Sequence, residues 1–347
     1  SSSQSATLFG ISSARTAFDD AASAAGIPTD FRTRLDSRQE LAAPLKIGFV
    51  DATPYIVGRV TGYDDDFQEF SGEDDKIRLF GGGGLRLHTS FHRTYDDVES
   101  KLLDIHRLRH ILEPSVHVFW GGATLDSTDL PTIDPDVERI EEGLAIRANI
   151  RNTLQTQRGG PGQWRSVDWL VWDNEVVLRS DDADVTRRVP RFFDHRPELS
   201  RGGDQFNSRL MWMVTDALAM TGQGIWSLER DQMEQWSIGL NLRHSSRLNT
   251  WIEYRDLDVF DSRIFRTGVN YQMTPRYRLG VNWSYDFRTD DTRSLDVELQ
   301  RRMPQAVLAI RAGLDDLEDE DIFSVSFTPI GVAGTRNRQF DDYFAND

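Results

Sequence analysis

The amino-acid sequence predicts an all-β protein, an antiparallel up-and-down β-barrel that crosses a membrane with its strands. Three observations lead to this prediction. Apolar and polar residues alternate along many segments, these segments are about 9–11 residues long, and short turns alternate with longer connections. The segment 277–288, YRLGVNWSYDFR, alternates almost without interruption. Such alternation indicates a strand, because successive side chains of a pleated strand point to opposite faces.

The same alternation recurs through the carboxy-terminal half, in the segments 236–243, 252–254, 265–273, 294–300, 306–314 and 321–330. Trp251 is an exception, since it falls on the opposite parity from Ile252 and Tyr254. Short turns at 245–247 and 274–276 alternate with acidic stretches at 256–262, 288–293 and 315–321. Short turns on one side of the membrane and long loops on the other are typical of up-and-down membrane barrels.

The amino-terminal half is less regular but has the same character, in the segments 44–63, 76–95, 113–122, 143–158 and 166–180. From the chain length we expect about 14 strands, which make this chain a fragment of a large barrel. We expect residues 1–29 to form a loop or linker, residues 30–335 the outer-membrane barrel domain, and residues 336–347 a carboxy-terminal tail. The opening SSSQSATLFG indicates that a further segment precedes it.

The composition excludes several kinds of protein. The 347 residues include no run of about 18 apolar residues, so no transmembrane helix is expected. The net charge of −16 argues against a nucleic-acid partner, because phosphate binding favours a basic surface. The absence of cysteine excludes disulfides, thiol catalysis and cysteine metal sites.

The alternation also predicts which residues meet water. In a membrane barrel the apolar face contacts lipid and the polar face lines the lumen. We therefore expect the lumen and the substrate path to include Arg266, Arg278, Asn282, Asp286 and Arg311. A soluble sandwich would instead have to cover the aromatic faces, and the sequence shows no amphipathic helix or second kind of sheet for that purpose. Candidates for the interfacial aromatic girdles are Trp120, Trp226, Tyr277, Phe287 and Phe340.

Glycines and prolines mark special positions in these strands. The run Gly81–Gly84 lacks the Lys and Ser/Thr of a phosphate-binding loop and is expected to permit a bend or a close backbone approach. Prolines remove hydrogen-bond donors from a sheet, so they are expected to weaken pairing at Pro44, Pro54, Pro114 and Pro329. Pro329 lies in the last expected strand and is our candidate for a lateral seam.

Three further elements, in a fixed order, go beyond general barrel patterns. The first is LRHILEP, the second belongs to the connection that follows, and the third ends the next strand. Their residues are Leu108, Arg109, His110, Leu112, Glu113 and Pro114; then Asp134, Asp136, Arg139 and Ile140; then Asn152, Leu154, Gln155, Thr156 and Arg158. In this order they resemble the carboxy-terminal barrel domain of the LptD family, the lipopolysaccharide-assembly outer-membrane proteins also called organic solvent tolerance proteins (OstA). The resemblance covers about residues 34–173, including Pro44 and Pro54.

The resemblance implies a non-enzymatic translocon that inserts lipopolysaccharide into the outer leaflet of the cell outer membrane. It implies a plug lipoprotein (LptE-like) and periplasmic bridge proteins (LptA-like) as partners, no cofactor, and a seam through which the glycolipid leaves. Known members carry cysteines that tie a periplasmic domain to the barrel, whereas this chain has none. Two other functions stay open: a general porin-like channel, and a lipid hydrolase embedded in the barrel.

Few residues suggest covalent chemistry or metal binding. His88, Ser90 and His92 are expected on one strand face, where they suit a wet lumen as well as a metal or a hydrolase site. No third metal ligand is identifiable and no G-x-S-x-G nucleophile motif is present, so we expect neither a metal site nor an enzyme.

Overall fold

The computed structural model describes residues 4–14, 32–63, 76–126, 130, 137, 140, 142–160, 162–180, 203–258, 261–315 and 320–330. Eighteen β-strands account for most of these residues. They are β1 (Gln4–Ala14), β2 (Arg32–Ala42), β3 (Leu45–Ile47), β4 (Val50–Tyr63), β5 (Ile77–His88), β6 (Phe91–Ser100), β7 (Ile105–Ala123), β8 (Gly143–Arg158), β9 (Arg165–Arg179), β10 (Gln205–Trp212), β11 (Leu218–Ser227), β12 (Gln232–Arg243), β13 (Leu248–Leu257), β14 (Ser262–Thr274), β15 (Tyr277–Asp286), β16 (Asp291–Arg302), β17 (Ala306–Asp315) and β18 (Glu320–Pro329). Within the described ranges no helix is both long enough and apolar enough to span a membrane.

The strands belong to two compact units. The amino-terminal unit comprises Ser1–Trp212 and Gly222–Trp236, and the carboxy-terminal unit comprises Met213–Thr221 and Ser237–Asp347. Strands β11 and β12 each contribute residues to both units.

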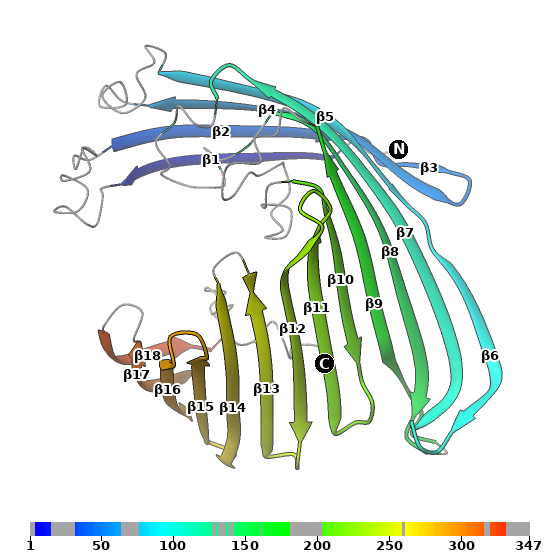
Figure 1. Cartoon of the computed structure of the whole chain (residues 1–347), viewed down its shortest axis with the longest axis vertical. Helices are drawn as coiled ribbons and strands as arrows, with labels where there is room; N and C mark the ends of the chain where they lie inside the picture. The colour runs from blue at the N-terminus through cyan, green and yellow to red at the C-terminus, as the bar shows by residue number, and fades with distance from the viewer. Residues whose placement is uncertain are drawn as a thin grey trace. The chain divides into compact units, whose positions relative to one another are not determined.

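The amino-terminal unit is an antiparallel meander. β1 pairs with β2, β2 with β4, β4 with β5, β5 with β7, and β7, β8, β9 and β10 follow in chain order (Figure 1). The connections 64–76, 124–142 and 180–204 leave one end of these strands, and the short turns 101–104 and 159–164 leave the other. This arrangement confirms the predicted all-β, antiparallel, up-and-down fold.

One expected boundary is wrong. Gln4–Ala14, inside the predicted linker 1–29, forms β1 and pairs with β2 from Gln4 opposite Ala42 to Ala14 opposite Arg32. The sequence gives little warning, because Leu8, Phe9 and Ile11 do not alternate; the backbone ladder with β2 stabilises the strand instead. The rest of that linker and the predicted tail 336–347 lie outside the described residues.

Prolines interrupt two strands of this unit, as expected. β2 and β3 pair with β4 in one continuous register, and the gap between them falls where Ala43 and Pro44 face Pro54 and Thr53. β5 and β6 likewise share one register on β7, and their gap lies opposite Pro114, whose carbonyl accepts a hydrogen bond from the Thr89 amide at 3.2 Å. Since proline has no amide hydrogen, each ladder lacks a donor there. These interruptions, together with β1, explain part of the excess over the predicted 14 strands.

The carboxy-terminal unit is a second antiparallel meander, with pairs β13–β14, β14–β15, β15–β16, β16–β17 and β17–β18 (Figure 1). The acidic stretches that we expected to form long loops are mostly parts of strands. Asp256 pairs with Arg263, Asp286 with Asp291, and Asp315 with Glu320, so only 258–261, 287–290 and 316–319 connect these strands. Shorter loops leave room for more strands, which further explains the low estimate of 14.

The two faces of each sheet differ in polarity. In the carboxy-terminal unit, Val269, Val281 and Val297 lie side by side on one face, which we call the outer face. Phe323, Val325 and Phe327 of β18 are 74%, 59% and 64% exposed on that face, and Ile56 and Trp120 are 63% and 61% exposed on the equivalent face of the amino-terminal unit. The opposite face, the inner face, carries mainly polar and charged residues. Exposed apolar side chains in such a continuous band suit contact with lipid.

Glycines of β5 and β7 make space for aromatic rings on the inner face. A Cβ atom at Gly84 would lie 2.6 Å from the Tyr55 ring, and one at Gly82 would lie 2.8 Å from the Phe119 ring and 2.7 Å from the Trp120 carbonyl oxygen. Tyr55 and Phe119 stack at 6.1 Å and form a cluster with Ala42, Val57, Phe80 and Ile140. The glycine run therefore permits close approach, as predicted, and it does so for aromatic rings.

We expect Gly82→Ala to destabilise the folded protein by about 1–3 kcal/mol, because the new methyl group meets backbone as well as a packed ring. Gly81→Ala is the matched control: nothing lies within 4 Å of a Cβ there, so little change is expected. Urea unfolding in lipid vesicles, followed by tryptophan fluorescence, measures both. Equal unfolding midpoints for the two variants would contradict this account of the glycine run.

Candidate functional site

The predicted lumen residues of the carboxy-terminal unit share the inner face. Asn270, Gly280, Glu298 and Arg311 follow one another across β14, β15, β16 and β17. Arg266 faces Ser284, Arg278 faces Gln272, and Asn282 faces Gly268, all on that same face. The structure therefore brings Arg266, Arg278, Asn282 and Arg311 onto one polar surface.

Ion pairs and hydrogen bonds hold these arginines across the strands. Arg311 Nε donates to Asp296 Oδ1 at 2.7 Å, and Arg278 Nη2 donates to Asn270 Oδ1 at 3.2 Å. Arg266 Nη1 lies 3.5 Å from Glu253 Oε2, and Arg255 binds the other oxygen of that carboxylate at 2.8 Å. The pair of Arg266 with Glu253 is directly opposite and those of Arg311 and Arg278 are diagonal, and cross-strand pairs of both kinds stabilise a sheet and keep the guanidinium groups on the polar face.

Asp286 and Trp251 have local structural roles on the same face. Asp286 ends β15 and accepts hydrogen bonds from Ser262 Oγ at 2.6 Å and from the Arg288 amide at 3.0 Å. It is 4% exposed, so it organises the turn rather than presenting a carboxylate to the lumen. The Trp251 ring lies over Gly268, where a Cβ would be 2.4 Å from the indole nitrogen. The space above this glycine explains why Trp251 points to the polar inner face, unlike Ile252 and Tyr254.

Sequence reasoning missed a denser charge cluster in the amino-terminal unit. Arg34, Asp36 and Arg38 are only 5%, 6% and 8% exposed on the inner face of β2. Arg59 of β4 binds Asp36 with two hydrogen bonds of 2.7 Å each, and Thr61 Oγ1 donates to the same carboxylate at 2.9 Å. The strict alternation of R-T-R-L-D-S-R-Q-E at 32–40 is a signal that could have identified this face.

Polar contacts continue across this inner face. Glu175 of β9 is 2% exposed, lies 3.6 Å from Arg147 Nε, and accepts a hydrogen bond from Asn207 Nδ2 at 3.3 Å. The Tyr55 hydroxyl and His117 Nε2 are 2.7 Å apart, and the Arg86 guanidinium lies 4.1 Å from the centre of the Tyr55 ring. The inner face is thus a connected polar surface on which most charges have partners.

Two of the three family-like elements pair residue by residue. Leu108, Arg109, His110 and Leu112 of β7 lie opposite Thr156, Gln155, Leu154 and Asn152 of β8, respectively. His110 Nε2 is 3.2 Å from Asn152 Oδ1 on one face, and Glu113 lies opposite Arg151 on the other. Pro114, opposite Ile150, is the residue that interrupts the neighbouring strand. Segments separated in the sequence therefore form one structural motif.

A polar hollow of about 330 Å³ lies at the short-turn end of this motif. Its lining residues are His92, Thr94, Arg107, Arg109, Gln155, Thr156, Gln157 and Ser166. Arg107 forms an ion pair with Asp96 at 2.6 Å, and Gln155 donates to Asp168 at 2.8 Å. Arg109 has no carboxylate within ion-pair distance among the described residues, so its guanidinium is available to an anionic group.

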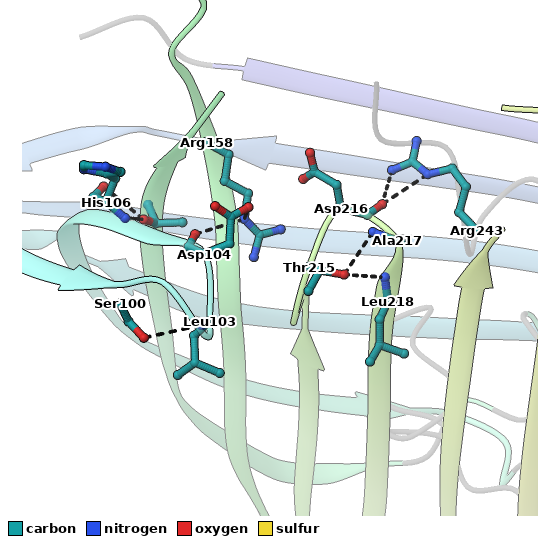
Figure 2. A network of polar contacts seen from close by, with 11 residues as sticks. Ser100, Leu103, Asp104, His106, Arg158, Thr215, Asp216, Ala217, Leu218 and Arg243 are labelled. Carbon is teal, nitrogen blue, oxygen red and sulfur yellow. Dashed lines mark hydrogen bonds and ion pairs between the residues drawn. The ribbon is translucent and has the colours of Figure 1, made fainter. Parts of the chain in front are cut away.

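Buried polar contacts hold the turn beside this hollow. Arg158, 1% exposed, lies with its Nε 3.2 Å from Asp104 Oδ2 and donates to the Asp104 carbonyl at 3.3 Å (Figure 2). Thr156 Oγ1 donates to the His106 carbonyl at 3.0 Å and accepts from the His106 amide at 2.9 Å. These contacts fix the β6–β7 turn against the end of β8.

The connection between β7 and β8, which contains the second family-like element, is tied to the inner face. Arg78 of β5, 3% exposed, donates hydrogen bonds to the carbonyls of Leu125, Val137 and Ile140 at 3.1, 3.1 and 2.8 Å. Ile140 packs in the cluster of Tyr55, Phe80 and Phe119. Asp134 and Asp136 lie outside the described residues.

The histidines and Ser90 do not form a catalytic or metal-binding group in the described part of the chain. Ser90 lies in the gap between β5 and β6, while His88 and His92, opposite Ser115 and Ile111 of β7, lie on the same face as expected. His88 lies 3.9 Å from Glu113, whereas His92 lines the hollow. Among the described residues no three His, Asp or Glu side chains are grouped so as to bind a metal ion.

Pro329 and Phe287, two further predicted positions, lie at strand ends. Pro329 ends β18, opposite Ala306, in the last described strand. Phe287 contacts Tyr254 and Tyr285 at ring distances of 6.2 and 5.2 Å, and Trp283 and Phe265 extend this aromatic group. Phe340 lies outside the described residues. An aromatic group at the end of an apolar face is typical of a membrane interface.

Together these features confirm the predicted location in an outer membrane. The sheets have an exposed apolar face, a connected polar face and an aromatic group at strand ends, and in the amino-terminal unit short turns lie opposite long connections. This combination is that of an outer-membrane barrel wall.

No protein-family model and no curated protein matches this sequence. Among solved structures, a mutant of the porin of Rhodopseudomonas blastica is similar over 94% of this chain and 98% of the porin, with 10% identity and a TM-score of 0.41. The FrpB iron transporter from Neisseria meningitidis is similar over 86% of this chain and 55% of the transporter, with 11% identity and a TM-score of 0.40. The strand pairing and the two faces of this chain, rather than that likeness, establish its fold.

Proposed function

We propose that this chain is part of an LptD-type outer-membrane translocon, which inserts lipopolysaccharide into the outer leaflet without enzymatic chemistry. The observation that carries the proposal is the pairing of the two family-like elements, Leu108–Pro114 and Asn152–Thr156, residue against residue. Both elements resemble the family in sequence, and the strands that carry them are adjacent and paired. The partners would be a plug lipoprotein (LptE-like) and periplasmic bridge proteins (LptA-like).

The chemistry of the two faces supports an amphipathic anionic cargo. Lipopolysaccharide combines a sugar headgroup bearing phosphates with several acyl chains. The inner face of the amino-terminal unit carries Arg109 and Gln155, and that of the carboxy-terminal unit carries Arg266 and Arg311, which are charges and amides suited to the headgroup, while the outer faces contact lipid. The hollow at Arg109 and Gln155 lies at the short-turn end, which in outer-membrane barrels faces the periplasm.

Crosslinking in cells tests this proposal. A photoreactive amino acid at Gln155, on the inner face, is expected to trap lipopolysaccharide when the protein is expressed within its full-length parent. The matched control carries the photoreactive amino acid at Leu154, the adjacent position on the opposite face. It is expected to trap phospholipid only. Equal lipopolysaccharide adducts at both positions, or none at Gln155 in a folded protein, would refute the proposed path.

A porin-like channel is the second candidate, because polar inner faces with paired charges also line passive pores. It predicts steady ion conductance of the isolated chain in planar bilayers and no lipopolysaccharide adduct at Gln155. The two measurements together separate the candidates.

A further inference from the structure

Six exposed arginines lie at the short-turn ends of the strands of the carboxy-terminal unit. They are Arg243, Arg247, Arg276, Arg278, Arg301 and Arg302, and we call them the arginine rim. They come from the β12–β13, β14–β15 and β16–β17 turns and the strand residues beside them. In a chain with a net charge of −16, such a one-signed group requires an explanation.

The three turns of the arginine rim are neighbours. The backbone N–H of Gln272 donates to the Arg247 carbonyl at 2.7 Å, which joins the β12–β13 turn to the β14–β15 turn. The Arg302 amide donates to the Arg276 carbonyl at 2.7 Å, and Tyr277 lies opposite Arg301, which joins the β14–β15 turn to the β16–β17 turn. The six arginines therefore come from adjacent strand ends, with Arg278 and Arg302 at inner-face positions and Arg301 at an outer-face position.

The arginine rim has only neutral partners among the described residues. Arg243 donates to the backbone carbonyl of Asp216 (Figure 2), Arg278 to the Asn270 side chain, and Arg301 lies 5.6 Å from the Tyr277 ring centre. No described carboxylate lies within ion-pair distance of any of the six.

The opposite ends of the same strands provide the contrast. There Arg263 lies 3.6 Å from Asp256, Arg293 lies 3.5 Å from Asp286, and Arg288 pairs with Asp261. Arginines at that end are neutralised within the protein, whereas those of the arginine rim are left for an external anion.

The outer face beside the arginine rim is apolar. Tyr271, Met273 and Leu299 are 41%, 43% and 37% exposed there, within a few residues of the short turns. A ligand that satisfies both surfaces must carry a negative charge at one end and hydrocarbon at the other. An acidic protein would match the arginines only, whereas an anionic lipid matches both surfaces.

We propose that the arginine rim binds the phosphate groups of anionic phospholipids in the membrane leaflet on the short-turn side, with their acyl chains lying on the apolar outer face. This anchors the strands at a fixed depth in that leaflet. The inference requires that the chain lies in a membrane, but it does not require lipopolysaccharide transport, so either proposal can fail without the other.

The absence of cysteine allows a clean test on the full chain. A fluorophore on Gln305→Cys, in the β16–β17 turn, reports on the arginine rim, and one on Thr289→Cys, in the β15–β16 turn, reports on the opposite end. The labelled protein is reconstituted into phosphatidylcholine vesicles that contain a minor fraction of brominated phosphatidylglycerol or of brominated phosphatidylcholine. We expect the anionic lipid to be enriched about fivefold or more at Gln305→Cys, as judged by quenching, and not at Thr289→Cys.

Charge variants decide whether the arginines cause this enrichment. The triple variant Arg276→Gln, Arg301→Gln, Arg302→Gln should bring quenching by the two lipids to equality, and Arg288→Gln at the opposite end should leave it unchanged. The triple variant Arg276→Lys, Arg301→Lys, Arg302→Lys should retain the preference for phosphatidylglycerol, because the charges remain. In the protein with all six arginines, about 1 M salt should abolish this preference, because the Debye length falls to about 3 Å. If phosphatidylglycerol and phosphatidylcholine quench equally in the unmodified rim, or if the preference survives both the Gln changes and high salt, the proposal is wrong.

Discussion

Replacing Asp36 with Ala is expected to destabilise the protein by about 3–5 kcal/mol, because it leaves buried guanidinium groups without their counter-charge. The side chains of Asp36 and Arg59 are each 9% exposed and share two hydrogen bonds of 2.7 Å. Arg34 and Arg38 lie on the same face of β2, so the loss of this carboxylate also increases repulsion among cations.

Urea unfolding in lipid vesicles measures this loss. Asp51→Ala is the matched control, since Asp51 faces Lys46 at 3.7 Å with both side chains more than half exposed, and a surface pair contributes little. The double variant Asp36→Leu, Arg59→Met should recover part of the stability, because removing both partners leaves no orphaned charge from this pair. An Asp36→Ala protein as stable as Asp51→Ala would show that the cluster is well hydrated.

Replacing Arg78 with Met is expected to cost about 3 kcal/mol and to release the β7–β8 connection from the inner face. Met retains much of the apolar stem but leaves the carbonyls of Leu125, Val137 and Ile140 without this donor. Hydrogen bonds from a charged group contribute about 1.5–3 kcal/mol each and do not add fully, which gives this estimate.

Two measurements separate release of the connection from general destabilisation. Limited proteolysis should cut within 124–142 faster in Arg78→Met than in the unmodified protein, and conductance in planar bilayers should rise if the connection narrows the lumen. Arg93→Met is the control, because Arg93 is exposed and its guanidinium contacts only the Tyr95 ring, at 5.0 Å, among the described residues. Unchanged cleavage within 124–142 would mean that Ile140 and the aromatic cluster hold the connection without Arg78.

The alternation of Tyr277–Phe287 was enough to predict a strand and to assign Arg278 and Asn282 to a polar face, because the period of a strand is a local property of two residues. It also predicted Arg266 and Arg311 correctly by face. The same rule had no signal in Gln4–Ala14, and it took Asp286 for a lumen residue although hydrogen bonds from the adjoining turn enclose it.

What the sequence determined by itself was the fold class, the two faces and the donor-poor positions at Pro44, Pro54 and Pro114. Only the tertiary structure decided which residues meet: Asp36 with Arg59, Arg78 with the β7–β8 connection, and Arg109 with Gln155. The physical reason is that the side of a strand on which a residue points depends on its neighbours in the chain, whereas its partner depends on the register between strands. Register is fixed by the sum of many weak contacts along both strands, and no single segment contains that information.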